Sequence, residues 1–210
     1  MLTSGATWVT NPSLCRIGTC IEFNGNGGDA RPPAFDITPN ITIAGWIRAD
    51  DFGISDARII SKATGIQEQD HYFMLSTVST DGGQTFVPRF RLKTNGQTTT
   101  LIANSGGNLV TGVWTHVAAV YNGSNMILYK NGVEVGRTSK TGSVSTSGSV
   151  NVRIADNPSD DKPFDGKMDD LRIYNRGLSG GEIANLAGGG DGGPPPTPSP
   201  TPTPTPTPSS

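Results

Sequence analysis

The acidic residues of this chain do not form the pair that hydrolysis of a glycosidic bond requires. That reaction uses two carboxylates about 5–10 Å apart on either side of the scissile bond. The glutamates stand at positions 22, 68, 134 and 182, and none belongs to an E-x-D-x-x-E pattern. His71 and His116 stand in no cysteine or serine motif that indicates a nucleophile. We therefore expect a binding domain, although a small hydrolase or lyase using His71, Tyr72 and the arginines stays open as an alternative.

Two adjacent aspartates near the start of the last strand-like segment present a second kind of chemistry. Asp169 and Asp170 begin an apolar alternation, in which Asp169 has the same strand parity as Leu171 and Ile173. That parity points the Asp169 side chain toward a core edge, where a carboxylate must be paired, hydrogen-bonded or metal-bound. Two interpretations stay open: calcium ligands, or an Asp169 that caps local backbone N–H groups beside a solvated Asp170.

A glycine-rich segment, NGNGGDA, offers more oxygen ligands of the kind that calcium takes. Its side chains are Asn24, Asn26 and Asp29, and its glycines allow backbone carbonyls to turn inward. The segment is therefore a candidate cation-binding loop.

The two cysteines, Cys15 and Cys20, are separated by four residues. A structural zinc site requires four ligands, but the sequence contains no other cysteines and only two histidines. We favour a local disulfide over free thiols, and a disulfide indicates an oxidising compartment. The first residues, MLTSGATWVT, lack a charged segment followed by an apolar one, so no signal peptide is expected in this chain.

Several strand-like segments place arginine and aromatic side chains on their polar sides. In RFRLK, the side chains of Arg89 and Arg91 alternate with apolar ones. The same alternation puts Tyr72 and Arg153 opposite apolar neighbours, and gives Trp46 polar neighbours on its side. Guanidinium groups donate forked hydrogen bonds to hydroxyls or carboxylates, and aromatic rings stack on sugar rings. A sugar-binding surface and a plain solvated face with Trp46 under loops both fit this pattern.

Runs of alternating apolar and polar residues, bounded by turn residues, dominate the chain and predict strands. They span residues 41–49, 71–78, 85–93, 113–121, 126–130, 133–138, 150–155 and 168–174. Asn131-Gly132 predicts a tight hairpin, because a type I′ turn needs positive φ at both central residues. Ser179 and Glu182 form a capping box that predicts one short helix ending at Gly188. These elements favour an all-β fold, an antiparallel two-sheet β-sandwich with one short C-terminal helix.

Composition limits the partners and divides the chain. The net charge of −2 offers no basic patch for nucleic acid, and no apolar run approaches the length of a membrane span. Residues 188–210 are rich in Gly, Pro and Thr and contain no large apolar side chain with which to build a core. We expect a folded domain over residues 1–187 and a disordered linker over 188–210, whose Thr-Pro repeat favours polyproline II and a length of roughly 45 Å.

Three segments carry a family likeness: GVWTHVAAVYNGSNMILYKNGVEVG, VNVRIADN and FDGKMDDLRIYNRGLSGGEIANL. They strongly resemble the concanavalin-like jelly-roll domains of the laminin-G-like superfamily, in the bacterial branch attached to polysaccharide-degrading enzymes and surface proteins. CIEFNGNGGDA and ITIAGWIRA look like that family's first two strands, so the likeness covers roughly residues 18–187. It implies two curved antiparallel sheets, often one structural calcium, and binding, usually of carbohydrate, rather than catalysis.

The resemblance also assigns candidate sites. The family's calcium commonly lies where the glycine-rich segment meets the aspartate pair, so the predicted calcium ligands are Asn26, Asp29, Asp169 and Asp170. The family often builds binding loops after the strand at residues 150–155, which adds two residues to the sugar-binding set. The predicted carbohydrate-binding residues are Tyr72, Arg89, Arg91, Arg153, Asp156 and Asn157.

Pro-Thr spacers are typical of modular secreted enzymes that degrade glycans. We therefore expect a non-catalytic, secreted carbohydrate-binding module, joined in cis to a catalytic domain, whose ligand is a polysaccharide or oligosaccharide. An adhesion or protein-interaction domain of a surface protein is the alternative, because the same fold serves both functions. No nucleic-acid or membrane partner is expected.

Overall fold

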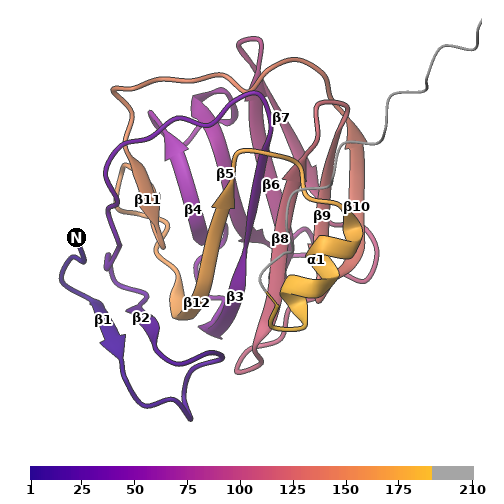
Figure 1. Cartoon of the computed structure of the whole chain (residues 1–210). Helices are drawn as coiled ribbons and strands as arrows, with labels where there is room; N and C mark the ends of the chain where they lie inside the picture. Colours follow the sequence, from indigo (N-terminus) through magenta and orange to yellow (C-terminus); the bar gives the residue numbers. More distant parts are fainter. Residues whose placement is uncertain (191–210) are drawn as a thin grey trace, which may run out of the picture.

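The computed structural model describes residues 1–190 and stacks two antiparallel β-sheets against each other (Figure 1). The first sheet has seven strands, in the order β1 (Ala6–Val9), β2 (Cys20–Asn24), β12 (Asp165–Tyr174), β3 (Ile41–Asp51), β8 (Thr115–Tyr121), β9 (Asn125–Lys130) and β10 (Val133–Ser139). The second has five, in the order β11 (Val152–Ile154), β4 (Arg58–Ala63), β5 (His71–Val78), β6 (Val87–Thr94) and β7 (Gln97–Ile102). The predicted two-sheet sandwich is confirmed.

Two short helices complete the described part of the chain. A 3₁₀ turn, η1 (Glu68–Asp70), precedes β5, and one α-helix, α1 (Gly180–Ala187), follows β12. Within residues 1–190 no helix is long and apolar enough to cross a membrane. The predicted linker at 188–210 lies, from residue 191 onward, outside the described residues.

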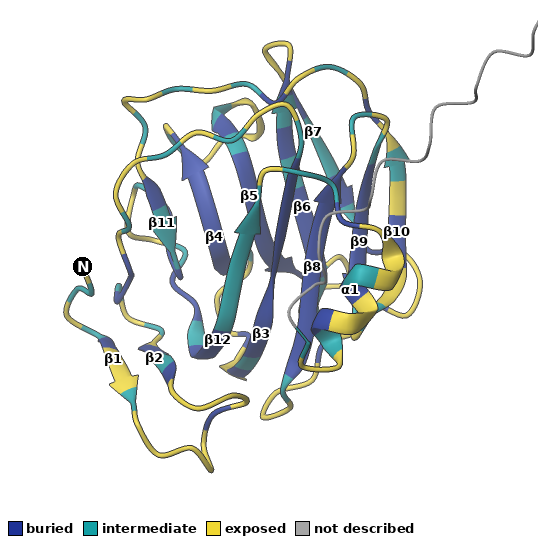
Figure 2. Cartoon of the chain, viewed as in Figure 1, coloured by how far each residue is buried: buried dark blue, intermediate teal, exposed yellow. Residues whose placement is uncertain are grey.

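The core fills the space between the two sheets, where alternate residues of each strand point inward. Ile43, Val117 and Leu128 of the seven-stranded sheet and Phe73 and Phe90 of the five-stranded sheet are all buried there. Burying a side chain of this size stabilises the fold by about 1.5–3 kcal/mol. Figure 2 shows the buried residues along the central strands and the exposed ones in the surrounding loops.

The outer face of the seven-stranded sheet is covered in part by α1. Ile183 and Leu186 of the helix pack on Ala44, Val120 and their neighbours, in a second apolar cluster. The predicted capping box is present: the Ser179 hydroxyl accepts a hydrogen bond from the N–H of Glu182 at 3.3 Å, and the Glu182 carboxylate accepts one from the N–H of Ser179. The cap and the apolar stripe explain why this short helix forms on the sheet surface.

The predicted hairpin between β9 and β10 is also present. Asn131 and Gly132 adopt φ of 49° and 81°, the left-handed pair that a type I′ turn requires. Local sequence therefore sets the register of this pair of strands.

Candidate functional site

Three arginines lie on the outer face of the five-stranded sheet. Arg89 and Arg91 on β6 are paired with Ser76 and Met74 on β5, and Arg58 on β4 is paired with the same Ser76. Because cross-strand partners share a face, the three guanidinium groups come from adjacent strands onto one surface. The parity expected for Arg89 and Arg91 agrees with this arrangement. Arg58 was not among the predicted residues. We call Arg58, Arg89 and Arg91 the arginine face.

One carboxylate, Asp56, serves two of these arginines. Both Arg58 and Arg89 form ion pairs with its Oδ1, and Arg58 also donates to its backbone carbonyl at 2.9 Å. Arg58 is 0% exposed and Arg89 is 7% exposed. Burial lowers the pKa of Arg58 to about 10 and the pKa of Arg89 to about 9. Arg91 differs, because within residues 1–190 it forms no ion pair: its Nε donates to the Thr100 hydroxyl at 3.2 Å, and its Nη1 lies 3.4 Å from His71 Nδ1.

His71 lies beneath the arginine face. Its Nδ1 is 2.8 Å from the carbonyl oxygen of Gln67, so this nitrogen carries the proton and Nε2 faces Arg58 Nη2 at 3.4 Å. Burial, followed by the positive charges of Arg58 and Arg91, lowers the pKa of His71 to about 4. His71 is therefore a neutral side chain that positions arginines.

Tyr72 occupies the neighbouring part of the sheet. Its ring lies under the Lys93 ammonium group, which is 5.1 Å from the ring centroid. Lys93 also donates to the backbone carbonyl of Gln69. The half-buried Tyr72 ring is thus already engaged by a cation on one side.

Arg153, a predicted sugar-binding residue, contacts Asp29, a predicted calcium ligand. Arg153 Nη1 lies 3.0 Å from Asp29 Oδ2 and also pairs with Asp160. Asp29 further accepts hydrogen bonds from Arg31 Nε at 2.8 Å and from the Thr3 hydroxyl at 2.6 Å. Two guanidinium groups therefore already neutralise the fully buried Asp29 carboxylate.

Asp156 and Asn157 organise the loop that follows β11. Asp156 Oδ1 accepts hydrogen bonds from the N–H groups of Asn157 and Lys162, at 2.8 and 3.0 Å. Asn157 Nδ2 donates to Asp161 at 2.7 Å, and the Lys162 carbonyl accepts from the N–H of Arg58. Burial raises the pKa of Asp156. Both predicted residues are 0% exposed, so in this conformation they hold the loop and do not face solvent.

The expected parity of Asp169 is wrong, because β12 contains a bulge. The pairing passes from Asp169 opposite Trp46 directly to Arg172 opposite Ala44, and Asp170 adopts a left-handed φ of 48°. Asp169 therefore points to the outer side of the seven-stranded sheet. Its Oδ2 accepts hydrogen bonds from the N–H groups of Arg16 and Ile17, at 2.9 and 2.7 Å. Asp169 thus accepts from backbone N–H groups, but these lie 152 and 153 residues away and are not the local ones expected, and Asp170 is paired with Arg172.

The predicted calcium ligands do not meet in one place. In the register of β2 and β12, Asn24 lies opposite Asp165, four residues or about 13 Å along the strand from Asp169. Asn26 is exposed, and Asp170 forms an ion pair with Arg172 at 2.7 Å. These side chains, as arranged, do not fit a shared calcium shell. Calcium binding stays an untested prediction.

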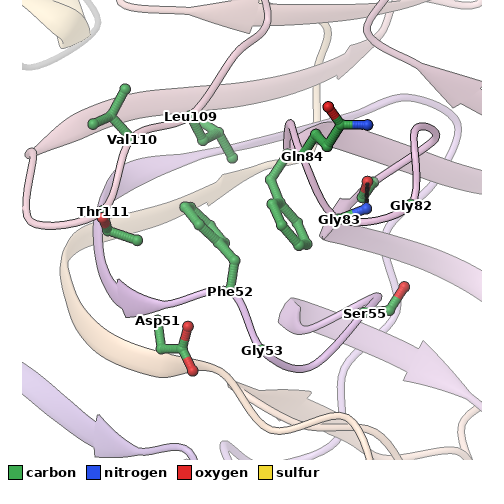
Figure 3. A pocket seen from close by; sticks show the side chains of 12 residues that line it. Asp51, Phe52, Gly53, Ser55, Gly82, Gly83, Gln84, Leu109, Val110 and Thr111 are labelled. Atoms are coloured by element: carbon green, nitrogen blue, oxygen red, sulfur yellow. Dashed lines mark hydrogen bonds between the residues drawn. The ribbon is translucent and has the colours of Figure 1, made fainter.

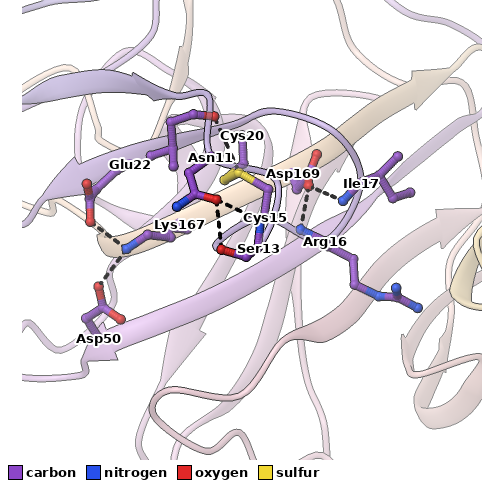
Figure 4. Close-up of a disulfide and its surroundings, with 11 residues drawn as sticks. Asn11, Ser13, Cys15, Arg16, Ile17, Cys20, Glu22, Asp50, Lys167 and Asp169 are labelled. Atoms are coloured by element: carbon purple, nitrogen blue, oxygen red, sulfur yellow. Dashed lines mark hydrogen bonds and ion pairs between the residues drawn. A yellow bond between two sulfur atoms is a disulfide. The ribbon is translucent and has the colours of Figure 1, made fainter.

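The predicted disulfide is present and closes a loop over β12 and β3 (Figure 4). Cys15 and Cys20 have Cα atoms 5.5 Å apart. Arg16 in this loop lies over the Trp46 ring, 4.4 Å from its centroid. The Cys15, Cys20 and Asp169 ligand atoms lie within 4.8 Å of one another, the only such His/Cys/Asp/Glu trio in residues 1–190, but the disulfide leaves no thiolate to bind a metal. Trp46 is thus covered, and it belongs to the sheet opposite the arginine face.

Comparison with known proteins gives one family match. Residues 24–184 match the family described as the concanavalin A-like lectin/glucanases superfamily. Comparison with curated proteins finds no match.

Solved structures similar to this chain include several domains linked to glycans. Domain 4 of AbnA, a GH43 extracellular arabinanase from Geobacillus stearothermophilus in complex with arabinotriose, has a TM-score of 0.65 and 21% identity, over 88% of this chain and 82% of that one. The IT-sialidase CBM40 of Ruminococcus gnavus, bound to alpha2,3 sialyllactose, has a TM-score of 0.64 and 17% identity, over 80% and 96%. A putative carbohydrate binding protein from Bacteroides ovatus has a TM-score of 0.55 and 19% identity, over 74% and 42%. At these identities the similarity is one of fold.

Proposed function

The chain belongs to the concanavalin A-like lectin/glucanases superfamily, and we propose that it is a non-catalytic carbohydrate-binding domain whose ligand is a negatively charged glycan. One observation carries the proposal: Arg91 lies beside Arg58 and Arg89 with no carboxylate paired to it in residues 1–190. Solved structures of the same fold that bind arabinotriose or sialyllactose support the sugar class.

The arginine face offers the donor geometry that an acidic sugar needs. A guanidinium group binds a carboxylate through two parallel N–H bonds, and such charge-assisted bonds are about twice as strong as neutral ones. Arg91 is half-buried, so its side chain is held in place while part of it stays accessible. Its neighbours Arg58 and Arg89 are fixed by Asp56. A uronate or sialate carboxylate would therefore meet a preformed cationic site.

The side chains around this face give little support to catalysis. Asp56 is engaged by two arginines, and Glu68 accepts a hydrogen bond from the Thr100 hydroxyl at 2.7 Å. His71 donates its Nδ1 proton to a backbone carbonyl, and the low pKa of its ring makes it a weak base. These contacts support binding without bond cleavage.

The cellular setting is part of the proposal. A disulfide is stable in oxidising compartments, and the arabinanase with the similar domain is extracellular. We place this domain outside the cell, attached in cis to a glycan-degrading domain. Such a domain raises the local concentration of its catalytic partner on the polysaccharide without adding new chemistry.

Calorimetric titration of the full chain with sialyllactose and with trigalacturonate tests the proposal. Arg91→Ala should weaken binding about tenfold or more, since one charge-assisted hydrogen bond contributes about 1.5–3 kcal/mol. Arg137→Ala is the matched control, because Arg137 is an exposed arginine paired with Glu134 on β10 of the other sheet. Equal loss in both variants, or no binding of either acidic sugar, would refute the arginine face as the site. Release of a shorter sugar would refute the non-catalytic part.

A further inference from the structure

An open cavity of about 800 Å³ lies at one end of the sandwich (Figure 3). Three connections line it: the segment after β3, the loop between β5 and β6, and the segment before β8. It contains none of the predicted site residues. A concave site of this size can hold one or more sugar rings.

Two stacked phenylalanine rings form an apolar wall in this cavity. The centroids of Phe52 and Phe86 are 4.8 Å apart and their planes differ by 12°. Phe52 belongs to the core and Phe86 packs against it, so neither ring is free to move away. The N–H of Leu109 donates to the Phe86 carbonyl at 2.8 Å and ties the third connection to the same wall. In Figure 3 the Phe52 side chain points toward the Leu109 side chain.

The loop between β5 and β6 is built before any ligand arrives. Asp81 Oδ1 accepts hydrogen bonds from the Ser79 hydroxyl and from the N–H groups of Gln84 and Thr85, at 2.8, 3.1 and 2.9 Å. The Thr85 hydroxyl also donates to Asp81 Oδ2. This bond makes the largest contribution, and together the bonds lower the pKa of Asp81 to about 2. A loop held in this way needs little ordering on binding, so less of the interaction energy is lost.

The polar groups of the cavity suit hydroxyl groups and disfavour anions. Asp51 is the only charged residue that lines it, and within residues 1–190 its carboxylate accepts no hydrogen bond and forms no ion pair. Gln84 donates its Nε2 to the Asp81 carbonyl at 3.1 Å, which leaves Oε1 as an acceptor. With one carboxylate and no cation in its lining, the cavity repels acidic sugars and accepts hydrogen bonds from neutral ones.

We propose that this cavity is a second carbohydrate subsite, which binds an uncharged sugar residue. The C–H face of the ring packs on Phe52 and Phe86, and ring hydroxyls donate to Asp51 and to Gln84 Oε1. Ser55, which lines the cavity, directly precedes Asp56, the partner of Arg58 and Arg89. The two sites therefore adjoin, and a glycan with both neutral and acidic residues could contact both. The subsite itself does not depend on the anionic-glycan proposal.

Amide chemical shifts of the ¹⁵N-labelled full chain test the subsite. The probes are maltotriose, cellotriose, xylotriose and arabinotriose, each titrated alone to millimolar concentration. At least one should shift the amides of Gly82, Gly83 and Val110 progressively. Asp51→Asn, which keeps the side-chain shape, should weaken that sugar about tenfold, the equivalent of one hydrogen bond to a charged group. Gln84→Ala should weaken it to a smaller extent.

Two control variants separate this proposal from the preceding one. Glu134→Gln removes one carboxylate on β10 that does not line the cavity, and should leave the neutral sugar bound as before. Arg91→Ala should weaken the binding of acidic sugars and leave that of the neutral sugar unchanged. The subsite is refuted if no probe shifts these amides, if Glu134→Gln weakens binding as much as Asp51→Asn, or if only acidic sugars enter the cavity.

Discussion

Replacing Asp169 removes the acceptor that holds the disulfide loop against β12. Its 6% exposed carboxylate receives two backbone N–H bonds, at 2.9 and 2.7 Å. A hydrogen bond to a charged group contributes about 1.5–3 kcal/mol, but Arg16 and Ile17 are exposed residues whose amides can find water once freed. We therefore expect Asp169→Ala to cost about 2 kcal/mol. Asp169→Asn, which keeps one oxygen acceptor, should cost about 1 kcal/mol.

The disulfide and Asp169 should depend on each other. The sequence separation of the two cysteines is 5, for which loop-closure entropy predicts a stabilisation of about 2 kcal/mol. Without the bridge, the amides of Arg16 and Ile17 are no longer held in front of Asp169. Asp169→Ala should then cost about 1 kcal/mol less in a chain carrying Cys15→Ser and Cys20→Ser than in the native chain.

Urea unfolding followed by circular dichroism measures the free energy of unfolding of the four chains to be compared: the native chain, Asp169→Ala, the double cysteine variant and their combination. For a domain of this size 1 kcal/mol shifts Tm by about 2–4 °C, so Asp169→Ala should lower Tm by about 4–8 °C. Asp170→Asn is the matched control, because asparagine tolerates the φ of 48° and can still contact Arg172. An equal cost for Asp170→Asn and Asp169→Ala, or additive costs for Asp169→Ala and the loss of the disulfide, would contradict this coupling.

Two further experiments test the pH dependence of stability and the calcium prediction. The pKa of His71 is about 4, below the value of 6.5 in an unfolded chain, so the unfolded state binds more protons between these values and stability falls as pH drops from 6.5 toward 4. His71→Gln should flatten that decline in urea midpoints, and an unchanged slope would contradict the assignment. If calcium binds the folded domain, a chelator lowers Tm and added calcium restores it. A Tm that changes with neither would contradict the calcium prediction.

Local patterns account for most of the sheet architecture. The alternation around Phe90 placed Arg89 and Arg91 on the outer face, and Asn131-Gly132 marked the β9–β10 hairpin. β4 escaped prediction because its polar residues, Arg58, Ser61 and Lys62, do not alternate regularly with its apolar ones, although all six residues are buried. Its buried polar groups find partners far along the chain, as Lys62 does with Asp36 at 2.5 Å. Such partners leave no mark in a local pattern.

The candidate sites were harder to predict, because they depend on register and on contacts between distant segments. One bulge at Asp170 turned Asp169 from the core side to the outer side. Asp29 was expected beside Asp169, but a bridge between Ala30 and Ile154 places it beside Arg153, 124 residues away. Neither the bulge nor the bridge has a periodic signature that a single sequence could reveal.

The position of α1 determines how this domain can be mounted for measurement. The helix packs on the outer face of the seven-stranded sheet, whereas the arginines lie on the outer face of the other sheet. Because the two sheets are stacked, about 10 Å apart, their outer faces point in opposite directions. A biosensor chip that captures the chain through a tag following α1 therefore presents the arginine face to the flowing analyte. Capture through a lysine on β6, such as Lys93, would press that face against the chip.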